Sequence, residues 1–105
     1  MDTTAVNRWA EGLITERLLT ILDLGSVWVW EPESRETPPT VVICVNNANA
    51  ALIVREALPN LIRVVGNATI TTELTTVANL NTLPRAKDMP RHADMTMVWP
   101  TRRRR

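Results

Sequence analysis

The sequence predicts an α+β fold in which two helices pack on a mixed or mostly antiparallel sheet of about four to five strands. The chain has 105 residues, which fits one domain. Two stretches place apolar residues at helical spacing, and several shorter runs rich in Val, Ile and Thr lie between Pro, Gly or Asn residues, as strands do. We expect residues 1–101 to form a single domain and residues 102–105 to form a basic C-terminal tail.

The expected order of elements is α-β-β-α-β-β-β. The helices are expected at residues 3–23 and 48–58. The strands are expected at residues 26–31, 41–45, 61–65, 68–78 and 94–99. Proline-containing loops are expected at 32–39 and 79–93.

The first helix is predicted from an apolar stripe that includes Val6, Leu13 and Ile21. Asp2 or Thr3 can cap its start, and Gly25 follows its expected end. The next element, SVWVWE, alternates Val with Trp and predicts a strand with two apolar faces.

The middle of the chain predicts a compact strand–helix–strand unit. Residues 41–45 are continuously apolar, which favours a strand covered on both faces. Asn47 is a suitable N-cap for helix 48–58, and Pro59 is expected to end that helix. Strand 61–65 would then complete a βαβ unit or return antiparallel elsewhere in the sheet.

No known catalytic motif is visible in the sequence. The three glycines do not form a phosphate-binding loop, and His92 is the single histidine. The single cysteine, Cys44, excludes an internal disulfide and is expected to be a buried apolar side chain. We therefore expect neither catalysis nor a cofactor, and no metal site. No signal peptide or membrane-spanning run is visible.

The candidate contact residues are aromatic, acidic and basic. Trp28 and Trp30 would share one face of their strand, which indicates core or a subunit contact; a base-stacking platform is the alternative. Glu31, Glu33 and Glu36 lie in or beside the proline-rich loop, where they would form a solvated acidic segment or, as the alternative, bind a hard cation.

Charge is unevenly distributed along the chain. Residues 1–83 hold five basic and nine acidic side chains, a net of −4, whereas residues 84–105 hold seven basic and two acidic ones, a net of +5. The basic part predicts contact with an acidic partner surface. Its candidate contact residues are Arg85, Arg91, Arg102, Arg103, Arg104 and Arg105.

Two segments resemble a known family. PTVVICVNNANAALIVREALPNL has a strand followed by an Ala-rich helix, and ANLNTLPRAKDMPRHADMTMVWPTRRRR has an Asn-Leu-x-x-x-Pro loop, a second Pro-Arg pair, an alternating strand and a basic end. Both resemble the tail terminator, or tail-to-head joining, proteins of long-tailed bacteriophages. The matching positions include Asn79, Leu80, Pro84, Pro90 and Arg91.

The resemblance implies a virion structural protein that is not an enzyme. It implies a homohexameric ring that caps the last layer of the tail tube and contacts the head connector or stopper protein. The protein would then be in the host cytoplasm during assembly and at the head-proximal end of the virion tail.

Two alternatives from other classes remain open at this point. A small nucleic-acid-binding or regulatory viral accessory protein would use the terminal arginines for non-specific DNA or RNA contacts. A fragment of a helicase-like enzyme is weakly indicated by the possible βαβ unit, but no arginine-finger motif follows it.

Overall fold

The computed structural model describes residues 1–34, 36–74 and 95–100. It confirms the α+β class, with two helices and a mixed sheet of four strands. The elements are α1 (Thr3–Thr15), β1 (Leu24–Trp30), β2 (Thr40–Val45), α2 (Ala48–Val65), β3 (Thr69–Leu74) and β4 (Thr96–Trp99).

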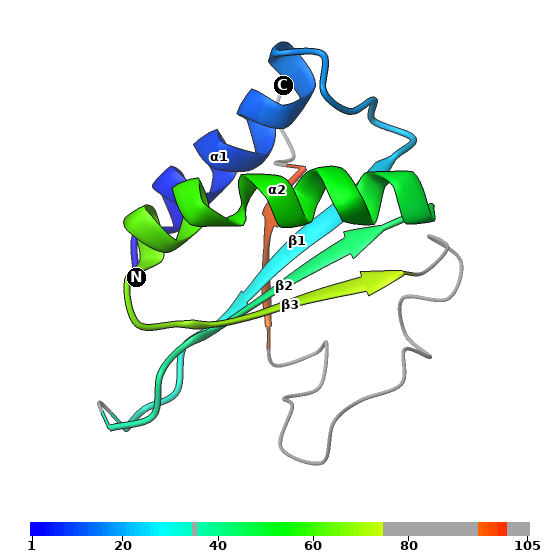
Figure 1. Ribbon diagram of the computed structural model, residues 1–105. Helices are drawn as coiled ribbons and strands as arrows, with labels where there is room; N and C mark the ends of the chain where they lie inside the picture. The colour runs from blue at the N-terminus through cyan, green and yellow to red at the C-terminus, as the bar shows by residue number, and fades with distance from the viewer. Residues whose placement is uncertain (35, 75–94, 101–105) are drawn as a thin grey trace, which may run out of the picture.

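Among the described residues the sheet has the strand order β3-β2-β1-β4, with β3 and β4 at its two edges. β1 pairs antiparallel with both β2 and β4, while β2 and β3 are parallel. The parallel pair is connected through α2, so β2-α2-β3 is a βαβ unit, but its second strand is β3 and not the strand expected at residues 61–65. Figure 1 shows both helices on one face of the sheet.

The main core lies between the helices and this face of the sheet. Alternate residues of the central strands point into it, including Val27, Val41 and Ile43, all fully buried. The helices contribute Val6 and Val54 among others. On the opposite face a smaller cluster forms around three buried residues, Val42, Cys44 and Met95.

Helix α1 ends eight residues before its expected end at residue 23. Arg17 has a φ of 60°, in the left-handed region, so the chain leaves the helix there. The N–H of Leu18 donates to the carbonyl of Leu13, and the N–H of Arg17 donates to that of Ile14. These two bonds are the Schellman pattern that satisfies the last carbonyls of a helix. Gly25 therefore lies in β1 and not at the helix end.

Helix α2 continues through Pro59, so the expected strand 61–65 is wrong. The start is as predicted, because Asn47 Oδ1 accepts from the N–H of Ala50 at 2.8 Å. Pro59 is exposed. A proline on the solvent side leaves the freed carbonyl of Arg55, four residues earlier, free to bond water. Leu61 is fully buried and continues the apolar face of the helix, which ends at Gly66 with a φ of 65°.

The other strands lie where the sequence predicts them, but some begin or end at different residues. β2 is buried along its whole length, as its continuous apolar run predicts. β3 covers the first part of the strand expected at 68–78, and β4 the last part of the one expected at 94–99. Residues 75–78 and 94 of those two expectations, and the loop 79–93, lie outside the described residues.

Candidate interaction surfaces

Trp28 and Trp30 lie on the sheet face that the helices do not cover. Both are half-buried and pack against the cluster of Val42, Cys44 and Met95. The indole N–H of Trp28 donates to Ser26 Oγ at 2.8 Å. Both indoles therefore pack against the sheet on this face and remain partly exposed in the described structure.

The cysteine in this cluster is chemically protected. Burial raises the pKa of the Cys44 thiol, and the Glu73 carboxylate, from the residue paired with Cys44 in β3, raises it further, although a hydrogen bond with Ser26 opposes them. A thiol held protonated is a weak nucleophile. Cys44 is therefore a packing residue, as its sequence context predicts.

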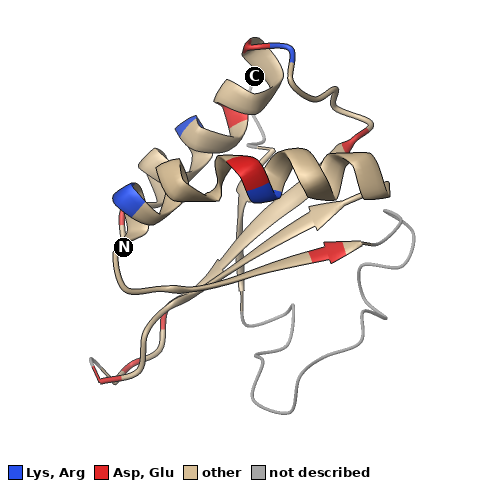
Figure 2. Cartoon of the chain, in the orientation of Figure 1, with Lys and Arg blue, Asp and Glu red and all other residues tan. Residues whose placement is uncertain are grey.

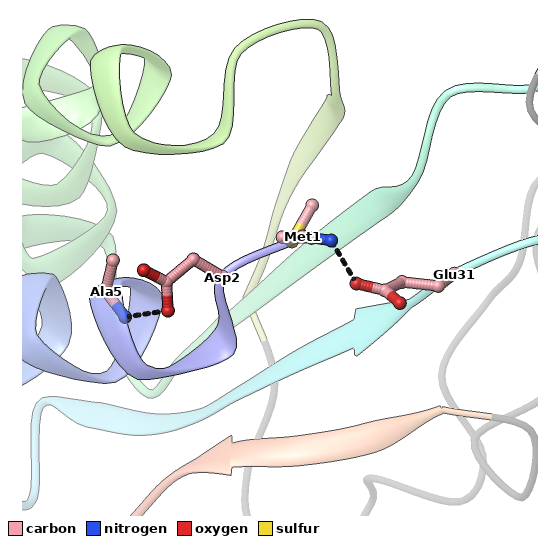
Figure 3. A network of polar contacts seen from close by, with 4 residues as sticks. All are labelled: Met1, Asp2, Ala5 and Glu31. Carbon is pink, nitrogen blue, oxygen red and sulfur yellow. Dashed lines mark hydrogen bonds and ion pairs between the residues drawn. The ribbon is translucent and has the colours of Figure 1, made fainter.

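The acidic residues around the β1–β2 loop do not converge on one point. Glu31 accepts the amino group of Met1 at 2.7 Å, beside the Asp2 side chain that caps α1 by accepting from Ala5 N–H (Figure 3). Glu33 and Glu36 are exposed. Among the described residues, no group of three or more His, Cys, Asp or Glu side chains is placed to hold a metal ion.

The loop between α1 and β1, residues 16–23, presents large aliphatic side chains to solvent. Leu22 is 82% exposed, Ile21 is 69% exposed and Leu18 is 48% exposed. Ile21 and Leu22 line a shallow apolar hollow together with Ile14 of α1 and with Arg17, Leu19 and Thr20 of the loop. Sequence analysis missed this surface because it placed Ile21 on the buried stripe of a longer helix.

Hydrogen bonds hold the α1–β1 loop in one shape. Asp23 Oδ2 accepts from the N–H of Thr20 at 2.9 Å and from its hydroxyl at 2.8 Å. Asp23 Oδ1 accepts from Asn47 Nδ2 at 2.8 Å. Asn46 Nδ2 donates to the carbonyl of Leu22 at 2.6 Å, and the N–H of Asn46 donates to the carbonyl of Asp23 at 2.9 Å. The loop is thus joined to the residues that connect β2 to α2.

The charge state of Asp23 follows from these bonds. The hydrogen bond from the Thr20 backbone, then those from the Asn47 and Thr20 side chains, lower the pKa of the Asp23 carboxyl below its ordinary value of 3.8. The carboxylate is therefore ionised, and accepts all of these bonds, at neutral pH.

Two further exposed aliphatic residues lie beside the β3 edge of the sheet. Leu74, at the end of β3, is 61% exposed, and Ile62 of α2 is 50% exposed. Glu73 is the one charged residue of β3, and the other strands carry none (Figure 2). On α2, the exposed Arg55 lies two turns before Ile62 on the same flank of the helix.

The basic candidates Arg85, Arg91 and Arg102 to Arg105 lie outside the described residues. Within the described part of the chain, neither helix has the length and apolar character needed to cross a bilayer.

Comparison with protein-family models, with curated proteins and with solved structures finds no match. The function of the protein therefore has to be inferred from its own residues.

Proposed function

We propose that this protein is a structural subunit of a phage tail that assembles into a ring, in the manner of the tail terminators that its sequence resembles. It acts by docking onto copies of itself, onto the tail-tube protein and onto the head-tail connector, and not by catalysis. The α1–β1 loop, residues 16–23, is the observation that carries this proposal.

The exposed aliphatic side chains of the α1–β1 loop favour a docking role. Burying a Leu or Ile side chain contributes about 1.5–3 kcal/mol, and Ile21 and Leu22 gain little of this within the described chain. Exposed aliphatic residues grouped in this way are typical of protein contact sites. Association with another surface would bury these side chains and so contribute this free energy.

The hydrogen bonds of the loop strengthen this argument. A contact loses affinity when its side chains must be ordered on binding, and a surface that is already ordered avoids that loss. Asp23, Asn46 and Asn47 fix the backbone on either side of Ile21 and Leu22 before any partner arrives. The loop has the character of a preorganised contact site.

A ring needs one surface of each copy to meet a different surface of the next. Such heterologous contacts close when the rotation between neighbours fits a whole turn, here with about six copies. We assign the α1–β1 loop to one side of this contact.

The test is the double variant Ile21→Asp/Leu22→Asp. The wild-type protein is expected to form rings at the ends of purified tail tubes in negative-stain images and to stop tube growth. The double variant is expected to leave tube ends uncapped, because two carboxylates would have to be desolvated in the contact. Far-UV circular dichroism should be unchanged, since both side chains are exposed.

Leu52→Asp is the matched control, because Leu52 is 57% exposed on α2 and does not line the apolar hollow. It is expected to cap tubes like the wild type. Capping by the double variant at wild-type level would refute the role of the loop. Failure of the wild type to bind tubes at any salt concentration would refute the tail-terminator assignment itself.

A further inference from the structure

We propose that the β3 edge of the sheet pairs with the β3 edge of a second copy, giving a two-fold dimer with one continuous sheet. This contact goes beyond the ring contact proposed above. A two-fold contact closes after two copies, so it adds a separate association and does not itself build a ring.

Within the described residues, the backbone of β3 is hydrogen-bonded to a neighbouring strand, β2, on one side only. The N–H of Thr69 donates to the carbonyl of Pro39 at 2.8 Å, which directs the backbone groups of Thr69 toward β2. Because these groups alternate along a strand, those of Thr71 and Glu73 also face β2, and those of Ile70, Thr72 and Leu74 face away from it. No strand lies beyond β3 in the sheet formed by the described residues.

The other edge of the sheet is protected. β4 has four residues, its register with β1 is irregular, and Pro100 follows it. Asn7 of α1 donates from its side-chain nitrogen to the carbonyl of Val98 at 2.6 Å. Short length, irregular pairing and an adjacent proline are the usual protections of edge strands. β3 has six residues and contains no proline, lysine or arginine.

The sequence of β3 is complementary to itself in one antiparallel register. A two-fold axis through Thr72, perpendicular to the sheet, places Ile70 opposite Leu74 of the second copy and Thr72 opposite its own counterpart. All of these residues have outward backbone groups, so each opposed pair exchanges two hydrogen bonds. The same register sets Glu73 opposite Thr71 and avoids two opposed carboxylates.

This register also covers the exposed aliphatic residues of this side. Ile70 and Leu74 lie on the helix-covered face, because their neighbours Val41 and Val45 belong to the main core. Ala57 of α2 faces α1, where its carbonyl accepts from the Trp9 indole at 3.1 Å. Helical spacing puts Ile62 on the opposite flank of α2, toward β3. The axis then brings the two α2 flanks together above the Ile70–Leu74 pairs.

Cysteine trapping tests both the contact and its register, in a Cys44→Ala background. Directly opposed residues of a hydrogen-bonded pair have Cα atoms about 5.5 Å apart, inside the range that a disulfide spans. Diagonal neighbours are about 7–8 Å apart, outside it. Thr72→Cys is therefore expected to form a disulfide-linked dimer on mild oxidation, and Thr71→Cys is expected to remain largely uncrosslinked.

Lysine substitutions give a second measurement by light scattering after size exclusion. Thr72→Lys is expected to convert the free dimer to a monomer, because two like charges would meet at the axis. Thr71→Lys is the matched control: its charge would face Glu73 of the second copy, so the dimer should persist.

A wild-type protein that is monomeric in the absence of tubes would overturn the proposal. That result is expected if another segment of the same chain covers the β3 edge. A Thr72→Lys variant that stays dimeric would also overturn it. The two proposals fail separately: the Ile21→Asp/Leu22→Asp variant should still crosslink through Thr72→Cys, and Thr72→Lys should still cap tubes.

Discussion

At the scale of single residues, Arg17 and Asp23 decide the shape of the α1–β1 loop. Arg17 adopts the left-handed conformation that usually falls to glycine, so the sequence contains no ordinary signal for the end of α1. Asp23 then fixes the loop through the hydrogen bonds of its carboxylate with Thr20 and Asn47. Ile21 and Leu22, the most exposed large aliphatic residues in the described part of the chain, owe their position to these two side chains.

Asp23 predicts a pH dependence of stability. Its pKa is lowered in the folded protein, so its carboxylate contributes stability above the unfolded value of 3.8, and that contribution is lost as pH falls through the lower folded pKa. Asp23→Asn is expected to have a smaller free energy of unfolding than the wild type at about pH 6, and the difference should shrink toward about pH 2. Urea denaturation at both pH values measures it. A difference that stays constant across this range would contradict the assigned role.

At the scale of elements, α2 shows how tertiary packing overrides a local signal. Pro59 is a strong helix breaker in sequence, and LIRVV after it is a plausible strand. The helix continues because Leu61 reaches the core formed by the sheet and α1, while the proline ring stays in solvent. Burial of one large aliphatic residue offsets much of the cost of one proline.

The continuous helix predicts that Pro59→Ala stabilises the protein. Proline in a helix interior lowers the free energy of unfolding by about 3 kcal/mol relative to alanine. Proline also restricts the unfolded chain, which raises the free energy of unfolding by about 1 kcal/mol. The free energy of unfolding is therefore expected to rise by about 2 kcal/mol, as measured by urea denaturation. Ala57→Gly, in the same helix, is the control and is expected to lower the free energy of unfolding. A loss of stability in Pro59→Ala would mean that the helix ends at residue 58.

At the scale of the whole molecule, the described charges lie on the loops, on the outer sides of the helices and on β3 through Glu73, and the other strands carry none (Figure 2). Of the two proposed contacts, the one at the α1–β1 loop relies on aliphatic side chains, and the one at β3 relies on backbone hydrogen bonds and the Ile70–Leu74 pairs. Their strength should change little with salt, because hydrophobic burial is not screened by ions as charge pairs are. Salt dependence therefore separates assembly from the nucleic-acid alternative.

That alternative predicts binding of DNA or RNA that weakens steeply with salt and is lost on deletion of Arg102 to Arg105. We expect the opposite: tube capping that persists in the deletion variant and no tight nucleic-acid binding at about 50 mM salt. Fluorescence anisotropy with labelled oligonucleotides, beside the tube assay, measures both. Tight, tail-dependent binding together with no capping would favour the accessory-protein function.

The sequence by itself determined the α+β class, the buried strand β2, the Asn47 cap and the packing role of Cys44, because each depends on local periodicity or on one side chain and its neighbours in the chain. Tertiary structure alone decided where α1 ends, that α2 passes through Pro59, and which strand is parallel to β2. These outcomes depend on what each segment meets across the core, and helical or strand propensity within a short window does not contain that information. Both proposed contact surfaces arise in the same way, because a side chain is exposed or an edge is open only with respect to the rest of the folded chain.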